Sequence, residues 1–392
     1  MNDIPKKLML LGGLRYLLPI IRVAHSLGIH VITVDYIPSN IAHKFSDEYY
    51  NVSITDKEEI LKLATKLDID GIMSFAVDPG VITAAYVAEK MHLPFQGSYS
   101  SINILQNKSR FREFLSVHNF NVPKAKGYDN KQEAIIESKD WKYPVIVKPV
   151  DSAGSKGVSK VTEPSSLGLA IDYAISKSQS GGFIIEEFII NRGPSSDSDS
   201  FTINGDLVIC TFSNQYFDSN ASNPFTPAAY SWPSLIDIEK QEELKRELQR
   251  LMFLLDMKTG IYNIETRIGE DGKAYIMEVS PRGGGNRLAE MVDIIYDTNL
   301  IENSVRASVN LPLLPINISE PKGFYTEIIL HSKNSGEFDT IELSKEIQPY
   351  LIETDLWVSK GEYVSDFKGA NNAIGTLVLR FESKEKLNPS VS

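Results

Sequence analysis

The sequence predicts an α/β protein in which a parallel sheet is followed by antiparallel hairpins. In the N-terminal part, apolar strand-like runs alternate with amphipathic helical segments, which is typical of a parallel sheet covered by helices. Further along, Asn204-Gly205 and Asp271-Gly272 each separate two runs of strand composition, as in tight hairpins. The chain has 392 residues, so we expect two or three domains rather than one core.

The composition argues against several classes of protein. A formal net charge of −11 is unfavourable for general binding of nucleic acid or of an anionic membrane surface. The apolar run near the N-terminus is interrupted by Gly12-Gly13 and Pro19, unlike a signal peptide, and no stretch is long and apolar enough to span a bilayer. The single cysteine, Cys210, allows no internal disulfide. We therefore expect a cytoplasmic protein in which Cys210 is a buried structural thiol.

The first unit predicts an α/β domain with an incomplete dinucleotide fingerprint. A buried strand leads into Gly12-Gly13, a helix over residues 15–27 follows, and the next strand ends at Asp35. This order is that of a dinucleotide-binding fold, but the third glycine position of the fingerprint is not filled. We therefore favour a substrate-side α/β domain over NAD binding.

The strongest signal for a site comes from the hairpin predicted over residues 258–280. With a two-residue type I′ turn at Asp271-Gly272, Glu265 lies directly opposite Glu278. Like charges that face each other destabilise a hairpin unless a cation compensates them. Two carboxylates suit Mg²⁺, which proteins commonly hold with one or two carboxylates plus phosphate oxygens. The alternative is a solvated polar face that carries two unrelated glutamates.

The same register fixes the remaining pairs and the two faces of the hairpin. It places Asn263 opposite Ser280 and Glu270 opposite Lys273. Strict alternation predicts a core face made of Tyr262, Ile264, Tyr275, Met277 and Val279. Residues 281–285, Pro-Arg-Gly-Gly-Gly, then set a cation and a run of amides beyond the carboxylates, where an anion can bind. This anion site favours the metal interpretation.

A second group of charged residues precedes the hairpin in the chain. Lys148 lies inside a short apolar strand, where a charge needs a partner. The small-residue loop of residues 151–157 follows, and such a loop can fold over phosphates with its amides. It is not the strand–loop–helix phosphate loop, because no helix follows directly. In a later strand Glu186 and Glu187 point to opposite faces, so one of them needs an amino group, such as an adenine amine or Lys148.

Three further segments carry specific expectations. We expect one helix over residues 100–117, which contains Lys108. Residues 192–198 read as a polar, serine-rich loop. Residues 220–232 are long, irregular and aromatic, which predicts a mobile loop.

Taken in chain order, these motifs resemble the ATP-grasp superfamily. The resemblance rests on LMLLGG, then Lys108, PVIVKPVDSAGSKGVS, FIIEEFI, and finally NIE with MEVSPRGGG, and it covers nearly the whole chain. The similar branch contains N5-carboxyaminoimidazole ribonucleotide synthetase, glycinamide ribonucleotide synthetase, biotin carboxylase and L-amino acid ligases. It implies an α+β architecture with four parts: a pre-ATP-grasp domain with a parallel sheet at 1–122, a small lobe with a glycine-rich flap at 123–190, a central antiparallel-sheet ATP-grasp domain at 191–310, and a C-terminal segment packed on it at 311–392.

The resemblance also implies a role for each candidate residue. The nucleotide would contact Lys108, Lys148, Gly154, Ser155, Gly157, Glu186, Glu187 and Ile189, with the last three at the adenine. Mg²⁺ would be held by Glu265, Glu278 and Ser280. The catalytic residues would be Arg282 and Lys148, with Arg282 stabilising the transferred phosphoryl group, since phosphoryl transfer needs positioning and charge neutralisation more than a covalent protein group. The implied cofactors are ATP and Mg²⁺, with Mn²⁺ as a substitute.

Two positions depart from the family pattern. Ser280 stands where an asparagine usually ligates metal, so the hydroxyl, water or Asn263 would have to assist a second Mg²⁺. Near Ser195 a glutamate that often binds the ribose is missing, and Asp197 or Asp199 would have to replace it.

The resemblance implies an ATP-dependent ligase. ATP would phosphorylate a carboxylate to an acylphosphate, which an amine would then attack. The partners would be ATP, a small carboxylate and an amine, without nucleic acid or membrane, and a homodimer is compatible with this reading. The alternatives are a carboxylase-like or purine-pathway enzyme with the same half-reaction, and a nucleotide-binding sensor that has lost catalysis, for which Ser280 is the main support.

Overall fold

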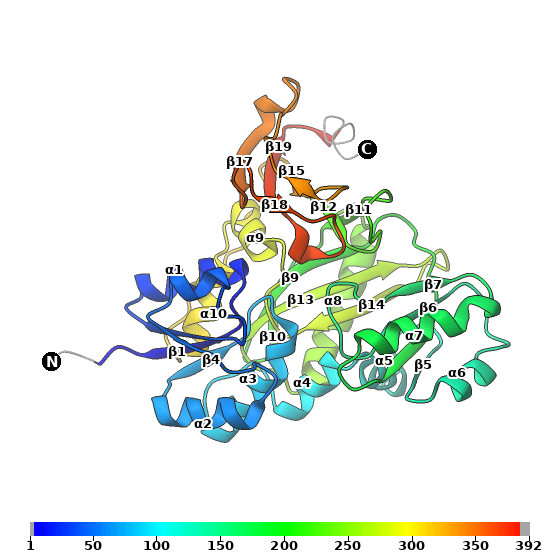
Figure 1. Cartoon of the computed structure of the whole chain (residues 1–392), viewed down its shortest axis with the longest axis horizontal. Coiled ribbons are helices and arrows are strands. Elements are labelled where there is room, and N and C mark those ends of the chain that lie inside the picture. The colour runs from blue at the N-terminus through cyan, green and yellow to red at the C-terminus, as the bar shows by residue number, and fades with distance from the viewer. Residues whose placement is uncertain (1–3, 385–392) are drawn as a thin grey trace.

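The computed structural model describes residues 4–384, whose strands form four large sheets and one small one (Figure 1). The N-terminal sheet and the small lobe with α6 and α7 lie at opposite ends of the view, and the central sheet with β9, β13 and β14 lies between them. A further sheet with β15, β17 and β19 stands above the centre. The fold thus combines a parallel sheet with antiparallel sheets, as predicted.

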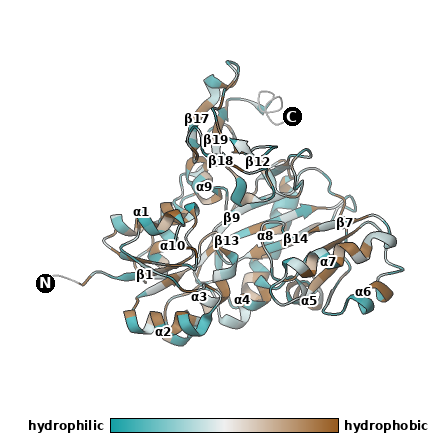
Figure 2. Cartoon of the chain, viewed as in Figure 1, coloured by the Kyte–Doolittle hydropathy of each residue, from teal (hydrophilic) through white to brown (hydrophobic). Residues whose placement is uncertain are grey.

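The N-terminal sheet is parallel, with strand order β3-β2-β1-β4. Its elements are β1 (Lys7–Leu11), α1 (Leu18–Ser26), β2 (His30–Val34), β3 (Glu48–Tyr50), α2 (Lys57–Leu67), β4 (Gly71–Met73) and α3 (Asp78–Met91). The helix predicted from residue 15 begins with a short 3-10 turn, Arg15–Leu17, before α1. Helices such as α2 carry brown and teal residues together in Figure 2, because one side packs on the sheet and the other meets solvent.

The helix predicted over residues 100–117 is two helices. α4 (Tyr99–Gln106) ends at Asn107, which is extended and whose side chain accepts a hydrogen bond from the Arg110 amide at the start of α5 (Lys108–Val117). An asparagine at this position caps a new helix instead of continuing the old one. The break makes Lys108 the first residue of α5, so its side chain is directed from a helix N-terminus toward the site.

The small lobe is an antiparallel sheet with strand order β5-β8-β6-β7, covered by two helices. Its elements are β5 (Ala125–Tyr128), α6 (Lys131–Glu137), β6 (Val145–Pro149), β7 (Ser159–Val161), α7 (Leu167–Lys177) and β8 (Phe183–Glu187). Its own hydrophobic core includes Val147, Ile171 and Phe183.

The central sheet is antiparallel, with strand order β10-β9-β13-β14. Its elements are β9 (Ser196–Ile203), β10 (Asp206–Cys210), α8 (Ile238–Leu254), β13 (Gly260–Ile268), β14 (Ala274–Ser280), α9 (Leu288–Tyr296) and α10 (Leu300–Ser308). The serine-rich loop predicted at 192–198 is wrong in its second half, because β9 begins at Ser196 and Ser196, Ser198 and Ser200 are buried. These small polar side chains were mistaken for a turn although they alternate along an interior strand.

The C-terminal sheet includes a segment from the middle of the chain. Its strand order is β11-β12-β15-β19-β17, formed by β11 (Asn214–Phe217), β12 (Pro227–Trp232), β15 (Phe324–Leu330), β17 (Leu351–Leu356) and β19 (Gly375–Phe381), while β16 (Gly336–Glu337) pairs with β18 (Tyr363–Val364). The mobile loop predicted at 220–232 is wrong over β12, where Tyr230 and Trp232 are buried. Their aromatic character reflects core packing against β15.

The central hairpin pairs Glu265 with Glu278 as predicted, but by a different route. The type I′ turn is wrong: the loop has three residues, closed by hydrogen bonds from the Gly269 amide to the Lys273 carbonyl and from the Gly272 amide to the Gly269 carbonyl. Within the loop only Gly272 has positive φ, at 75°, as in a type I turn followed by a left-handed residue. The longer loop shifts the register by one residue, and Glu270 therefore does not face Lys273.

A bulge further along the hairpin restores the predicted register. Glu265 faces Glu278 but Thr266 faces Ile276, so Met277 is an extra residue in β14. Between the bulge and the turn the faces of β14 are therefore reversed. The core side holds Ala274 and Ile276 instead of the predicted Tyr275 and Met277, whereas Tyr262, Ile264 and Val279 lie in the core as predicted.

Two further expectations can be compared with the structure. Within residues 4–384, no helix is long and apolar enough to cross a membrane. The Cys210 side chain is only partly exposed and packs beside the central core, and burial raises the pKa of its thiol to about 12. It is therefore an unreactive structural thiol.

Candidate active site

A row of three carboxylates crosses the central sheet. In the ladder Asp197 on β9 faces Glu265 on β13, which faces Glu278 on β14. The predicted pair of glutamates is thus extended by Asp197, a residue that the sequence reading had considered only for the ribose. It escaped notice because residues 192–198 were read as a loop.

A second row lies next to the first and connects the sheet to the glycine loop. Asp199, Asn263 and Ser280 face one another across the same strands. Both Asp199 oxygens accept from the Gly284 amide, at 2.9 and 3.0 Å, and the Asn263 amide donates to Asp197 at 2.6 Å and to Asp199 at 3.3 Å. Asp199 thereby fixes the loop that follows β14.

The electrostatics of these rows indicate an excess of negative charge. Burial, followed by repulsion from Glu265, raises the pKa of Asp197 to about 7. Burial also raises the pKa of Asp199 to about 7, although the Gly284 amide and Arg282 oppose the shift. A divalent cation beside Glu265 and Glu278 would relieve this repulsion, and carboxylate oxygens are the ligands that Mg²⁺ prefers. Within residues 4–384 no three acidic, histidine or cysteine side chains converge as a ready-made metal cage, which fits an ion held partly by phosphate oxygens and water.

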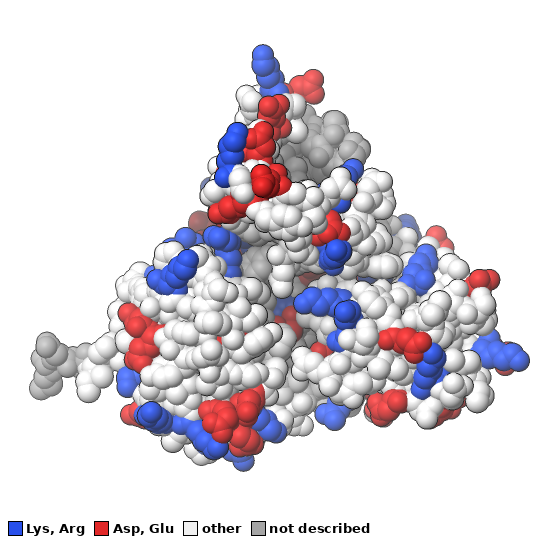
Figure 3. Space-filling model, in the orientation of Figure 1, with Lys and Arg blue, Asp and Glu red and all other residues white. Residues whose placement is uncertain are grey.

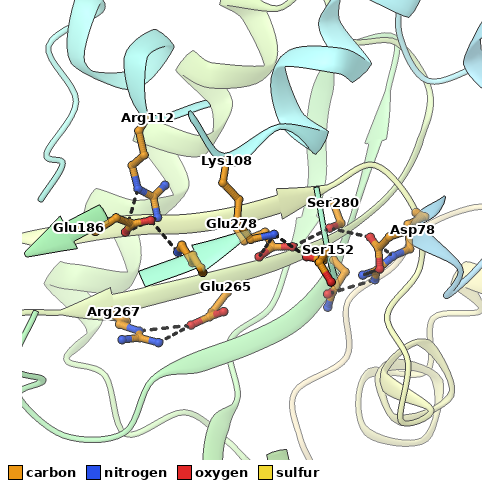
Figure 4. Close-up of polar contacts among 12 residues, drawn as sticks. Asp78, Lys108, Arg112, Ser152, Glu186, Glu265, Arg267, Glu278 and Ser280 are labelled. Carbon is orange, nitrogen blue, oxygen red and sulfur yellow. Dashed lines mark hydrogen bonds and ion pairs between the residues drawn. The ribbon is translucent and has the colours of Figure 1, made fainter. Parts of the chain in front are cut away.

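Two basic side chains neutralise the glutamates in part (Figure 4). Arg267, two residues along β13, donates to Glu265 at 2.8 Å. The Lys108 Nζ lies 3.8 Å from Glu278 Oε2 and donates to the Ser152 carbonyl at 2.9 Å. Lys108 therefore connects the carboxylate row to residues 151–157, the flap loop. The sequence had predicted that Lys108 contacts a nucleotide phosphate.

Arg282 is positioned by an aspartate from the N-terminal domain. Its guanidinium pairs with both oxygens of Asp78, at 2.9 and 2.7 Å, and it also donates to Asn263 at 3.2 Å. The Ser280 hydroxyl donates to Asp78 at 3.2 Å and to Glu278 at 3.3 Å. Burial opposes ionisation of Asp78, but the Arg282 guanidinium lowers the pKa of Asp78 overall. Asp78 and Arg282 therefore form an ion pair.

Asp78 is a site residue that the sequence reading missed. It is the first residue of α3 and follows the carboxyl end of β4. Side chains at that edge of a parallel sheet commonly line ligand sites. The Asp78-Pro79-Gly80 run was interpreted only as a helix start, and its position after a strand was the signal that would have found it.

Lys148 and Glu186 meet inside the small lobe. They are diagonal neighbours on β6 and β8, where Lys148 pairs with Ile184 and Glu186 with Ile146. Lys148 Nζ lies 2.6 Å from Glu186 Oε1. The other oxygen accepts from Arg112 on α5 at 3.3 Å (Figure 4). All three side chains are nearly buried. Lys148 is therefore the partner of Glu186, which is one of the two alternatives predicted for it. Arg112 is a second site residue that the sequence did not reveal.

The flap loop has the backbone that its glycines predict. Gly154, Ser155 and Gly157 all have positive φ, at 67°, 57° and 76°, so the loop turns tightly between β6 and β7. A Cβ on Gly157 would lie 2.8 Å from the Pro149 ring, and the position therefore requires glycine. The Ser155 hydroxyl donates to the Phe225 carbonyl at 2.8 Å, which ties the flap to the segment before β12. Figure 3 shows the surface hollowed between the flap, the N-terminal domain and the C-terminal sheet.

The residues predicted to contact the adenine and the ribose lie away from the carboxylate rows or are already engaged by other groups. The Glu187 amide already donates to the Lys124 carbonyl at 2.9 Å, and Ile189 follows the end of β8. Ser195, at the predicted ribose position, donates to Gln215 at 2.9 Å and is buried. Asp197 and Asp199 both point into the hairpin rows, so the structure gives neither of them a free ribose-binding face.

Comparisons with known proteins agree with this geometry. Residues 141–290 match the model of the ATP-grasp domain. That span contains Lys148, the flap loop, Glu186 and the hairpin with its glycine loop. Residues 141–290 form an ATP-grasp domain.

Whole-chain comparisons extend the likeness beyond that domain. A formate-dependent phosphoribosylglycinamide formyltransferase of Prochlorococcus marinus is 25% identical over 344 residues, which cover 85% of this chain and 83% of the relative. The L-amino acid ligase from Bacillus licheniformis shares the fold with a TM-score of 0.80, at 19% identity over 99% of this chain and 96% of that one. Phosphoribosylglycinamide synthetase from Anaerococcus prevotii gives 0.75, at 20% identity over 98% and 96%.

These findings confirm the predicted ATP-grasp resemblance and the predicted fold class. They also confirm the class of ATP- and Mg²⁺-dependent ligase at the level of the family. Solved structures of this fold include complexes with ADP and with its magnesium salt. The roles of individual residues and the substrate stay predictions.

Proposed function

We propose that this ATP-grasp protein activates a small carboxylate as an acylphosphate and joins it to an amine, releasing ADP and phosphate. The observation that carries the proposal is the ladder that sets Glu265 opposite Glu278, flanked by Arg282 and the glycine loop. Carboxylates for a cation and a buried arginine are groups that phosphoryl transfer needs.

Each part of the site supports one step of this chemistry. Lys148 and Lys108 would hold the phosphates of ATP, with the flap loop closing over them. Glu265 and Glu278 would hold Mg²⁺, which neutralises phosphate charge when bound. Arg282, aligned by Asp78, would stabilise the transferred phosphoryl group and the acylphosphate. Ser280 is engaged by Asp78 and Glu278, so we propose it as an orienting residue that contacts a metal only through its hydroxyl.

Hydroxylamine offers a direct test, because it attacks an acylphosphate and gives a stable hydroxamate with release of phosphate. Purified protein with ATP and Mg²⁺ should form a hydroxamate from at least one member of a carboxylate panel, with one ADP per hydroxamate. ATP hydrolysis that no carboxylate stimulates would instead support the sensor hypothesis. The carboxylase-like alternative predicts stimulation by bicarbonate, which is bound in a solved biotin carboxylase domain of this fold. The purine-pathway alternative predicts stimulation by formate with a ribonucleotide, as the name of the formate-dependent relative suggests.

Several broader expectations remain part of the proposal. The four-part division at residues 122, 190 and 310 is supported by the separate sheets, although β11 and β12 pair with the C-terminal strands. A cytoplasmic location is supported by the single cysteine. A homodimer is tested by light scattering of the purified chain.

A further inference from the structure

A buried glutamate on the C-terminal sheet has no partner. Glu327 lies on β15 and is completely buried, and neither of its carboxylate oxygens has a hydrogen-bond partner. A carboxyl group in this state has lost its hydration without compensation, whether it is ionised or protonated. Packing of the sheet alone would favour an apolar residue here. The unpartnered carboxyl group therefore indicates that Glu327 binds a polar group of a ligand.

The neighbours of Glu327 increase the local negative charge. Arg287 is close to it, but this guanidinium already pairs with Glu353 at 2.6 Å and with Glu290 at 3.3 Å. Burial raises the pKa of Glu327 well above its usual value; attraction by Arg287 opposes the shift, and repulsion by Glu290 and Glu353 adds to it. Three carboxylates thus share one arginine.

Glu327 adjoins the phosphoryl-transfer site. In the ladder it faces Tyr230 on β12, whose hydroxyl donates to Asp197 at 3.0 Å. The Asn286 amide, at the end of the glycine loop, lies 3.5 Å from the same hydroxyl, and its oxygen accepts from Tyr16 at 3.3 Å. Burial raises the pKa of Tyr16, and the nearby carboxylate of Glu327 raises the pKa of Tyr16 further. One tyrosine therefore separates the acidic row of the hairpin from the unpartnered glutamate.

We propose that Glu327 binds the ammonium group of an amino-carboxylate substrate, whose carboxylate is phosphorylated beside Arg282. This inference rests on the proposed ligase function. An ammonium group brings three hydrogen-bond donors and a positive charge, which are what an unpartnered carboxylate among other acids lacks. The substrate class is thus an amino acid or a short peptide rather than a plain carboxylic acid.

The hydroxamate reaction separates this inference from the proposed function. The twenty protein amino acids, γ-aminobutyrate and simple dipeptides are compared with matched acids that lack the amino group, such as propionate for alanine. We expect hydroxamate from amino compounds at a rate at least about tenfold above their des-amino counterparts, the value of one charged hydrogen bond. Equal rates would overturn the inference and leave the ligase function standing. No hydroxamate from either set would overturn both.

A matched pair of variants tests the residue itself. Glu327→Gln keeps the shape but cannot ionise to pair with an ammonium group, so KM for the amino-carboxylate should rise at least about tenfold while KM for ATP stays unchanged. Glu346→Gln makes the same substitution at an exposed position of the C-terminal part and should change neither constant. An unchanged KM for the amino-carboxylate in a folded Glu327→Gln protein, checked by circular dichroism, would contradict the assignment.

Discussion

The two halves of the site differ in how their charges balance. In the small lobe Glu186 lies between Lys148 and Arg112, so one buried acid meets two buried bases. Arg112 and Lys148 hold the pKa of Glu186 down to about 2, although burial opposes them. This half therefore carries a fixed positive excess of the kind that attracts phosphate oxygens.

The hairpin half has the opposite balance. Asp197, Glu265 and Glu278 lie in one row, and they are partly offset by Arg267, by the more distant Lys108 and, at Glu278, by Arg282. Burial, together with repulsion from Glu265, raises the pKa of Asp197. The charge balance of the small lobe suits the anionic end of a nucleotide, and that of the hairpin suits a cation. A magnesium–nucleotide complex would satisfy both at once. The predictions below test the two halves separately.

The largest expected effect is on the hairpin half. Glu278→Gln should lower turnover by at least about a hundredfold, since it replaces a charged metal ligand by a neutral one. The measurement is ADP formation over a titration of Mg²⁺. Glu270→Gln, the same substitution at the exposed turn of this hairpin, is the control and should keep full activity. Wild-type turnover in Glu278→Gln would place the metal elsewhere.

On the nucleotide half, Lys148→Ala should weaken ATP binding at least about tenfold, because a phosphate loses a buried cation. It should also destabilise the fold by about 3–5 kcal/mol, since Glu186 keeps only Arg112 in the interior. Calorimetry of ATP binding and denaturant unfolding measure the two effects. Lys160→Ala on the neighbouring β7 removes an exposed lysine and should leave ATP affinity near that of the wild type. Unchanged affinity in Lys148→Ala would remove it from the site.

A third prediction concerns Asp78, which holds Arg282 beside the hairpin half. Asp78→Asn should reduce kcat by about tenfold or more while KM for ATP changes little, because Arg282 keeps its position less well but the nucleotide groups are untouched. Steady-state kinetics at saturating Mg²⁺ give both constants. A change confined to KM for ATP would show that the Arg282–Asp78 pair contacts the nucleotide rather than the reacting group.

The last expected effect lies outside both halves, in the dependence of stability on pH. Because the pKa of Glu327 is raised in the folded protein, with Arg287, Glu290 and Glu353 as its charged neighbours and Tyr16 as a neutral one, its contribution to stability is complete below the ordinary glutamate pKa of 4.5. It decreases as the pH rises above that value, by up to about 1.4 kcal/mol per pH unit. Glu327→Gln should therefore raise Tm at pH 8 and have little effect at pH 4. A pH-independent difference in Tm would contradict the shifted pKa.

The sequence predicted most of the chemistry but less of the geometry. The glutamate pair, the lysine strand and the glycine flap could be found because strand alternation and turn residues are local properties. Asp78 and Arg112 could not be identified in the same way, because their roles arise from partners 204 and 74 residues away in the chain. The strand β12 was hidden for the same reason, since it pairs with β15 across a long insertion.

The central hairpin also shows that a contact can be predicted correctly from a turn and a register that are both wrong. The predicted two-residue turn and the absence of a bulge were both wrong, and the two errors cancelled at Glu265 and Glu278. They did not cancel near the turn, where Tyr275 and Met277 were assigned to the core. Strand pairs counted outward from a turn are therefore reliable only as far as the first irregularity in a strand.

That compensation leaves the pairing of the two glutamates independent of the bulge. If Met277 were removed, Glu278 would follow Ile276 directly, and because Ile276 faces Thr266, Glu278 would still face Glu265. The faces of β14 would then alternate regularly, with Ile276 on the core side and Glu278 on the side of the carboxylate row. The extra residue thus adds a local bend and twist to β14 without deciding which carboxylates meet.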